Sequence, residues 1–192
     1  MKILRYILFP VVPIYFFVTW LRNKLYDLGI KKSVSYNLPV ICVGNLSVGG
    51  TGKTPQIEYL IRLLNDRFKV SVLSRGYKRI SKGYVLLNDS HNALDVGDEP
   101  LQYYKKFTNI HVAVDANRVE GVSYLINSKA PEVILLDDAY QHRKIKGSFY
   151  ILLTKFNDLF TDDFLLPTGN LRESSRGAKR TDAIVVTKCP EN

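Results

Sequence analysis

A glycine-rich stretch between an apolar run and a helical pattern constrains this chain more than any other feature. Residues 47–54 read Ser-Val-Gly-Gly-Thr-Gly-Lys-Thr and follow an apolar run at 39–43. Apolar side chains at helical spacing come next: Ile57, Leu60, Ile61 and Leu64. Strand, glycine-rich loop ending in Gly-Lys-Thr, and helix are typical of a phosphate-binding P-loop. The alternative, a chance glycine-rich turn, is disfavoured by the flanking strand and helix.

The loop supplies the groups that hold a nucleotide phosphate. Its glycines let backbone N–H groups face an anion, and the helix N-terminus adds about half a positive charge. Lys53 has the reach to contact the β- and γ-phosphates, and the Thr54 hydroxyl suits Mg²⁺. One departure is Ser47, which stands at the first glycine of G-x-x-x-x-G-K-[ST]. We therefore predict that ATP and Mg²⁺ bind here, on Ser47, Val48, Gly49, Gly50, Thr51, Gly52, Lys53 and Thr54.

Charge and cysteine content limit the class of protein and its partners. The 192 residues are 46% hydrophobic and 23% charged, which indicates a globular chain with one α/β core. The net charge of 27 − 18 = +9 favours anionic partners such as nucleotides, nucleic acid or acidic lipid. Cys42 and Cys189 are the only cysteines, so no disulfide framework or zinc spacing exists.

The first 37 residues differ in character from the rest. Residues 6–21 carry no charge and are rich in aromatic side chains, which suit a lipid headgroup region. The stretch is short for a membrane span of about 20 residues, and Pro10 and Pro13 predict a bend in any helix there. Six basic residues against one acid give 6 − 1 = +5 before Pro39: Lys2, Arg5, Arg22, Lys24, Lys31 and Lys32, against Asp27.

Three interpretations of this segment differ in what surrounds it. A signal peptide is disfavoured because no A-x-A-like cleavage site follows and the P-loop needs cytosolic ATP. A buried core helix is the second alternative. We favour a membrane-associated helix that lies on the inner leaflet. The domains expected are residues 1–37, a membrane-associated segment, and residues 38–192, a P-loop domain.

Alternating strand and helix patterns follow the P-loop. Strands are predicted at 69–73, 83–87, 110–114, 133–136, 149–153 and 183–186, with helices at 100–106 and 117–127. Continuous apolar strands that alternate with helices predict an α/β fold, a mostly parallel sheet flanked by helices on both faces. Ligands of such sheets bind beyond the carboxyl ends of the strands. The P-loop, Ser74-Arg75, Asp137-Asp138 and Thr187-Lys188 all fall at those ends.

Two adjacent carboxylates, Asp137 and Asp138, end the apolar strand at 133–136. This pattern places a metal-directed carboxylate opposite a P-loop. We predict that Asp137 binds Mg²⁺ directly or through water, and that Asp138 orients the metal shell or carries a proton. Solvated acids at a strand end are the alternative.

Several motifs in order give the chain a family resemblance. They span residues 43–55 (VGNLSVGGTGKTP), 74–77 (SRGY), 96–100 (VGDEP), 137–142 (DDAYQH) and 166–173 (LPTGNLRE). With these motifs the chain resembles the tetraacyldisaccharide 4′-kinases, membrane-bound enzymes that phosphorylate a lipid A precursor. The family shares the serine at position 47. The resemblance implies transfer from ATP to the 4′-hydroxyl of tetraacyldisaccharide 1-phosphate, which gives lipid IVA.

The resemblance also implies roles for individual residues. Asp98 is the general-base candidate, although Gly97-Asp98-Glu99-Pro100 alone reads as a helix start with Asp98 at the N-cap. Arg172 holds phosphoryl oxygens, and Glu173 joins the metal shell or steers Arg172. The catalytic set is thus Asp98, Lys53, Asp138 and Arg172, and the metal set is Thr54, Asp137 and Glu173. Residues 172–180 carry a net charge of 4 − 1 = +3, which suits a phosphorylated glycolipid. The alternative is that this segment is a solvated basic loop.

Partners and location follow from the same resemblance. We expect the lipid A precursor and the membrane surface as partners, no nucleic acid, and a place on the cytoplasmic face of the bacterial inner membrane. His142 lies in the fourth motif, and we assign it to structure more than to chemistry.

The chain departs from the family in two ways. Ala139-Tyr140 replaces the usual Gly-Phe after the paired acids. Family members are longer, and the C-terminal part that carries an Asp-His-His segment is not found here. A non-catalytic nucleotide-binding remnant is therefore one alternative function. A partition-type ATPase is another, but that class needs a lysine before Gly49, where this chain has Val48.

Overall fold

The computed structural model describes residues 7–191, so Lys2, Arg5 and Tyr6 of the N-terminal prediction lie outside the described residues. The strands are β1 Val40–Asn45, β2 Val70–Ser74, β3 Val85–Leu86, β4 His111–Val114, β5 Val133–Leu136, β6 Phe149–Lys155 and β7 Ala183–Thr187. The α-helices are α2 Val12–Asp27, α3 Lys53–Leu64, α4 Ala93–Val96, α5 Asp98–Lys106 and α6 Arg118–Lys129. Two 3₁₀ helices complete the described part, η1 Phe9–Val11 and η2 Ser175–Arg180.

A single mostly parallel sheet organises the molecule. Its order is β3-β4-β2-β5-β1-β6-β7, and among the described strands only β3 runs antiparallel to its neighbour. Every strand predicted from the apolar runs is present, with ends that differ by up to two residues. The predicted α/β class and parallel sheet are confirmed.

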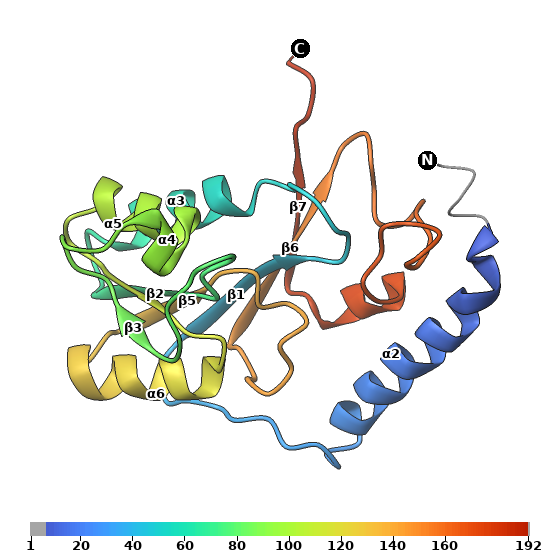
Figure 1. The fold of residues 1–192 in the computed structure, drawn as a ribbon, viewed down its shortest axis with the longest axis horizontal. Coiled ribbons are helices and arrows are strands. Elements are labelled where there is room, and N and C mark those ends of the chain that lie inside the picture. Colours follow the sequence, from blue (N-terminus) through green and yellow to red (C-terminus); the bar gives the residue numbers. More distant parts are fainter. Residues whose placement is uncertain (1–6, 192) are drawn as a thin grey trace.

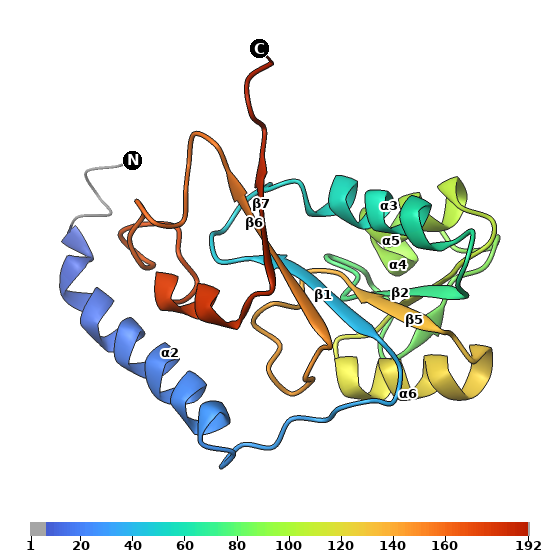
Figure 2. The same ribbon diagram turned by 180° about the vertical axis from the view of Figure 1, so that it is seen from behind.

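Helices cover both faces of the sheet, as Figures 1 and 2 show: α3, α4 and α5 lie on one side and α6 on the other. Alternate strand residues therefore enter different cores. Val70 and Val72 pack in the cluster that contains Ile57 and Ile61 of α3, whereas Leu73 packs with Val122 and Leu125 of α6. The continuous apolar strands read from the sequence reflect this burial on both faces.

The sequence patterns missed the short helix α4. Helix α4 begins at Asn92, whose side chain accepts hydrogen bonds from the backbone N–H groups of Leu94 and Asp95, and Asp95 completes a capping box. Gly97, at a φ of 95°, ends α4 and begins α5. Four-residue helices have too few turns to show an apolar period, so capping residues are their main sequence signal.

Helix α2 lies beyond the β6–β7 end of the sheet, alongside η2 (Figures 1 and 2). None of its residues is buried, so the alternative of a buried core helix is wrong. Pro10 and Pro13 lie in the first turns of η1 and α2, where the missing N–H leaves no partner unsatisfied. The helix type changes from 3₁₀ to α between these prolines, and the bend that we expected there stays a prediction. Within residues 7–191, no helix is long and apolar enough to cross a membrane.

Candidate active site

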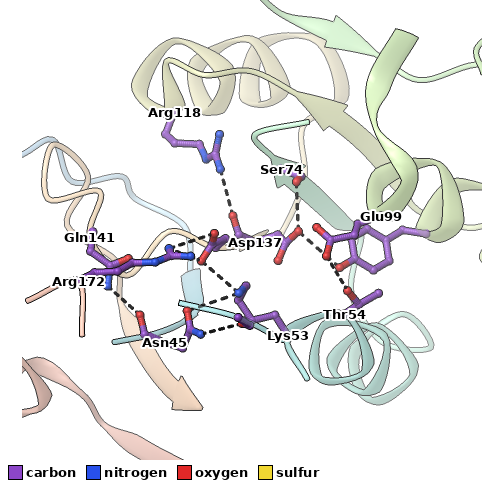
Figure 3. Close-up of polar contacts among 12 residues, drawn as sticks. Asn45, Lys53, Thr54, Ser74, Glu99, Arg118, Asp137, Gln141 and Arg172 are labelled. Carbon is purple, nitrogen blue, oxygen red and sulfur yellow. Dashed lines mark hydrogen bonds and ion pairs between the residues drawn. The ribbon is translucent and has the colours of Figure 1, made fainter. Parts of the chain in front are cut away.

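The carboxyl ends of the central strands bring Lys53, Thr54 and Asp137 to one edge of the sheet (Figure 3). The glycine-rich loop, residues 47–54, follows β1, the Asp137–Asp138 pair follows β5, and Ser74 ends β2. Because β2, β5 and β1 are neighbours in the sheet, their carboxyl ends converge.

The glycine-rich loop is shaped by two residues with left-handed backbone conformations. Gly49 has a φ of 110°, and Gly52, with a φ of 84°, is the N-cap of α3. Neighbouring segments hold the loop: the Thr187 hydroxyl donates to the Thr51 carbonyl at 2.9 Å, and the Val48 N–H donates to the Asn170 carbonyl at 2.8 Å. The loop thus leads directly into the N-terminus of α3, where backbone N–H groups favour an anion.

Lys53 lies at the first position of α3 with its ammonium between two oxygen partners. Its Nζ donates to Asn45 Oδ1 at 3.4 Å and pairs with Asp138 Oδ1 at 3.5 Å. Asn45 is fully buried, and its Nδ2 donates to the Gly49 carbonyl at 3.4 Å. The last residue of β1 therefore links the loop to its lysine.

Asp138 joins two of the predicted catalytic cations. Its carboxylate pairs with Lys53, and both of its oxygens lie 3.3 Å from Arg172 Nη1. The residue has a φ of 49°, a backbone conformation that is uncommon for residues other than glycine. Lys53, Asp138 and Arg172, which are far apart in the sequence, thus meet at one point.

Asp137 is the most perturbed carboxylate of the site. Its Oδ2 accepts hydrogen bonds from Ser74 Oγ at 3.1 Å and from the Tyr103 hydroxyl at 3.5 Å. Its Oδ1 is buried and has no partner among residues 7–191. Burial, followed by the negative charges of Glu99 and Asp138, raises the pKa of Asp137 to about 6. A buried carboxylate with a free oxygen is suited to a cation.

Glu99 is a site residue that the sequence interpretation did not select. The Thr54 hydroxyl donates to Glu99 Oε1 at 3.2 Å, and Figure 3 shows both beside Asp137. The signal was its place next to Asp98 in the 96–100 motif. Carboxylates and a hydroxyl are the hard oxygen donors that Mg²⁺ prefers, so Asp137, Glu99 and Thr54 fit this ion. Within the described chain no group of three or more His, Cys, Asp or Glu side chains forms a metal cage.

Asp98 lies at the first position of α5 and is exposed. Gly97 is the N-cap residue and Asp98 makes no capping hydrogen bond, so the N-cap interpretation of Asp98 is wrong. Within residues 7–191 no hydrogen bond or ion pair ties up this carboxylate. Asp98 is therefore exposed, adjacent in the chain to Glu99, and in this part of the chain no contact ties it to Lys53, Asp138 or Arg172.

Glu173 lies in a different environment from the one expected for a metal ligand. It is 3% exposed, and its two oxygens accept hydrogen bonds from Asn23 Nδ2 at 2.6 Å and from Arg180 Nη2 at 2.8 Å. These contacts connect α2 with η2. They give Glu173 a structural role and do not support its predicted place in the metal shell beside Thr54 and Asp137.

A basic cavity of about 260 Å³ adjoins Asp138. It is lined by Arg22, Arg75, Ala116, Arg118, Asp138, Gln141, His142 and Arg172. Arg118 is only 2% exposed, and its guanidinium donates to the carbonyl of Asp115 and, at 3.1 Å, to that of Asp137. Burial, with the charges of Arg118 and Arg22, lowers the pKa of His142 to about 4, so this imidazole is neutral at pH 7. Four arginines against one carboxylate make the cavity suited to an anion.

Comparisons with known proteins agree on one family. The family model described as tetraacyldisaccharide-1-P 4′-kinase matches residues 4–192. Two relatives, both called tetraacyldisaccharide 4′-kinase, come from Flavobacterium johnsoniae and Bacteroides thetaiotaomicron. The first is 61% identical over 100% of this chain and 57% of the relative, and the second is 54% identical over 96% and 49%.

A solved structure matches as well. The crystal structure of the "apo" form of LpxK from Aquifex aeolicus in complex with ATP has a TM-score of 0.90 and 41% identity to this chain. The match covers 96% of this chain and 59% of that one. The chain therefore spans between about half and three fifths of the length of these proteins.

Proposed function

Because the chain belongs to the tetraacyldisaccharide-1-P 4′-kinase family, we propose that it catalyses phosphoryl transfer from ATP to the 4′-hydroxyl of tetraacyldisaccharide 1-phosphate. The product is lipid IVA, an intermediate of lipid A biosynthesis. One observation carries the proposal: Lys53 and Arg172 flank the Asp138 carboxylate at the mouth of the glycine-rich loop. Two fixed cations at the end of a phosphate-binding loop are what transfer of a charged phosphoryl group requires.

The donor nucleotide binds along the glycine-rich loop. Backbone N–H groups at the start of α3 face the phosphates, and the Lys53 ammonium exchanges a protein oxygen for a phosphate oxygen. The relative from Aquifex aeolicus was crystallised in complex with ATP, which supports the same nucleotide here. Asp137, Glu99 and Thr54 would hold Mg²⁺, which would neutralise charge on the transferred group.

Asp98 acts as the general base. Its exposed carboxylate accepts the proton of the 4′-hydroxyl as the sugar oxygen forms a bond to the γ-phosphorus. The bond between that phosphorus and the bridging oxygen breaks, and ADP keeps the electron pair. Arg172 stabilises the negative charge on the transferred phosphoryl oxygens by charge-assisted hydrogen bonds.

The acceptor approaches from the basic cavity beside Asp138. This cavity lies on the Arg172 side of Asp138, whereas the loop lies on the Lys53 side. Its arginines complement the phosphate that the acceptor already carries. The acceptor and the nucleotide thus approach Asp138 from the sides of Arg172 and Lys53 respectively.

Helix α2 supports a place on the cytoplasmic face of the inner membrane. Its outer face presents Ile14, Phe17, Val18 and Leu21 at spacings of three and four residues, all exposed by at least 40%. Basic residues follow at the C-terminal end of the helix and after it, where they attract acidic lipid headgroups. An apolar acceptor held in a bilayer is then reached without extraction.

Deletion of residues 1–21 tests this location. We expect the shortened protein to bind ATP but to sediment poorly with anionic vesicles, since each basic residue near the surface contributes about 1 kcal/mol and the apolar face adds more. Neutral vesicles serve as the control for the charge contribution. Equal sedimentation of the full and shortened proteins would show that the segment is not the anchor.

A radiolabelled ATP assay with tetraacyldisaccharide 1-phosphate tests the activity. We expect label on the lipid with the unaltered chain, and a rate lower by about 10²–10³ with Lys53→Ala, because one preorganised cation is lost. Hydrolysis without lipid labelling would favour the partition-type ATPase. Binding without turnover would favour the non-catalytic nucleotide-binding protein.

A further inference from the structure

Helix α2 has a polar face turned towards the body of the protein. Tyr15, Thr19, Arg22, Asn23 and Tyr26 lie at spacings of three and four residues, so they share one side of the helix. This side contacts residues 172–173, just before η2, and the turn after β5, and Figure 2 shows α2 alongside η2. The apolar residues Ile14, Phe17, Val18 and Leu21 are exposed. An amphipathic helix that only packed on a protein would show the reverse arrangement.

The first contact reaches the main chain of a catalytic residue. The Tyr15 hydroxyl donates to the Arg172 carbonyl at 2.8 Å, and the Arg172 N–H donates to the Leu46 carbonyl at 2.7 Å. The backbone of Arg172 is therefore held from both sides, by α2 and by the end of β1. The Arg172 side chain extends from this fixed backbone to Asp138.

The second contact concerns the residue next to Arg172. Asn23 Nδ2 donates to the buried Glu173 carboxylate at 2.6 Å, opposite Arg180. A buried carboxylate that loses one of two partners is destabilised, because its desolvation is no longer compensated. Asn23 thus helps to keep Glu173, and with it the 172–173 peptide, in place.

The third contact leads to the glycine-rich loop. Arg22 Nη2 donates to the Gln141 carbonyl at 2.7 Å, and Gln141 Nε2 donates to the Asn45 carbonyl at 2.7 Å. Asn45 in turn holds Lys53. Figure 3 shows Gln141, Asn45 and Lys53 in this order across the site. One residue of α2 is therefore two hydrogen bonds away from Asn45, the partner of the lysine.

We propose that Tyr15, Arg22 and Asn23 are positioning residues, through which the docking of α2 holds Arg172 and the Asp137–Gln141 turn ready for transfer. The inference rests on the proposed function. Because α2 buries no residue, these polar contacts are a main part of its attachment to the body. A helix attached in this way detaches more readily than a core helix, and detachment would remove all three contacts at once.

Trypsin cleavage after Arg172 measures this contact without any need for catalysis. The Tyr15 hydroxyl bonds to the carbonyl of the peptide that trypsin cleaves, and burial and hydrogen bonding of that peptide protect it. We expect Tyr15→Phe to accelerate cleavage at Arg172 about 3–10-fold, the effect of one hydrogen bond. Thr19→Ala is the matched control, because within residues 7–191 the Thr19 hydroxyl bonds to carbonyls of α2 itself.

Steady-state kinetics on vesicles that contain the acceptor lipid supply the catalytic measurement. We expect Tyr15→Phe to lower kcat about 3–10-fold and Asn23→Ala to lower it about 10-fold or more, because Asn23 bonds to a charged group. The KM for ATP and vesicle sedimentation remain unchanged, and Asn23→Gln restores part of the rate. A role limited to stability would not separate kcat from KM in this way.

The two measurements separate the possible failures. If the wild-type chain labels no lipid, the proposed function is wrong. The cleavage rates still report whether α2 orders the Arg172 peptide. A wild-type chain that labels lipid, with unchanged cleavage and kcat in Tyr15→Phe and Asn23→Ala, overturns the positioning role. Faster cleavage with unchanged kcat overturns it as well.

Discussion

The sheet interior and helix α2 are both rich in apolar side chains, but they place them in opposite directions. Leu135 and Leu136 of β5 are fully buried, whereas Phe17 and Val18 of α2 are 56% and 58% exposed. In the body, polar groups collect at the edge of the sheet; in α2 they face the body. An apolar pattern therefore predicts that a helix or strand forms. The polar contacts of that helix or strand decide whether its apolar side packs on protein or faces away from it.

The difference extends to what each region does for the protein. Burial of apolar area stabilises the body, since a buried leucine contributes about 1.5–3 kcal/mol. The described residues of α2 bury no such side chain and connect to the body through hydrogen bonds and ion pairs. The interior should thus govern the stability of the fold, and the sheet edge should govern turnover. Helix α2 should govern where the protein is located and how Arg172 is aligned.

The largest effect should come from the sheet edge. Asp98→Asn keeps the shape of an exposed side chain but removes its proton acceptor. We expect kcat to fall by about 10²–10⁴ in an active member of this family, with ATP affinity and the unfolding midpoint nearly unchanged. Steady-state kinetics and urea unfolding measure the two. A clear loss of stability with normal turnover would contradict the role as base and show that Asp98 instead stabilises the start of α5.

A matched pair of truncations compares the interior with α2 directly. Leu135→Ala removes a fully buried side chain from β5, so the free energy of unfolding should fall by about 2–5 kcal/mol. Phe17→Ala removes a larger but exposed side chain and should change that free energy by less than about 0.5 kcal/mol. Urea unfolding in the absence of lipid measures both. Similar losses of unfolding free energy in the two variants would contradict the difference between the sheet interior and α2.

Asp137 is buried like the interior residues but lies at the edge of the sheet. Its contribution to the free energy of unfolding should depend on pH. Its pKa is raised from 3.8 to about 6, so the folded state binds a proton that the unfolded state has released between these values. The free energy of unfolding should therefore decrease as pH rises, by about 3 kcal/mol over the whole titration of this group, of which about 2 kcal/mol falls between pH 4 and 6. Asp137→Asn should flatten this decrease and be the more stable protein at pH 7. If Asp137→Asn leaves the pH dependence of the unfolding free energy unchanged, the raised pKa of the buried Asp137 carboxyl is contradicted.

Local sequence patterns predicted most of the fold because each strand carries its own continuous apolar run. They also predicted the glycine-rich loop and the paired acids, since both are contiguous motifs. Arg22 and Arg118 of the basic cavity could not be predicted in this way, because strand order and the docking of α2 bring them together from distant segments. Glu173 was assigned to the metal because its motif gave no sign of Asn23, a partner 150 residues away.

The helix start at Asp98 shows a second limit. Asp at the beginning of a helix fits either the N-cap or the first turn, and the two differ by one residue. Gly97 takes the N-cap position with a positive φ, which leaves the Asp98 side chain unused by the backbone. Backbone geometry rather than residue type decided this case.

The restraint of Lys53 has a consequence for the entropy of nucleotide binding. A mobile lysine side chain carries about 2 kcal/mol of rotamer entropy, which an incoming phosphate would normally have to remove. Here Asn45 and Asp138 already hold the ammonium, so that loss occurs on folding. An arriving phosphate exchanges partners with an ordered cation, and Asp138 keeps its second cation, Arg172, throughout the exchange.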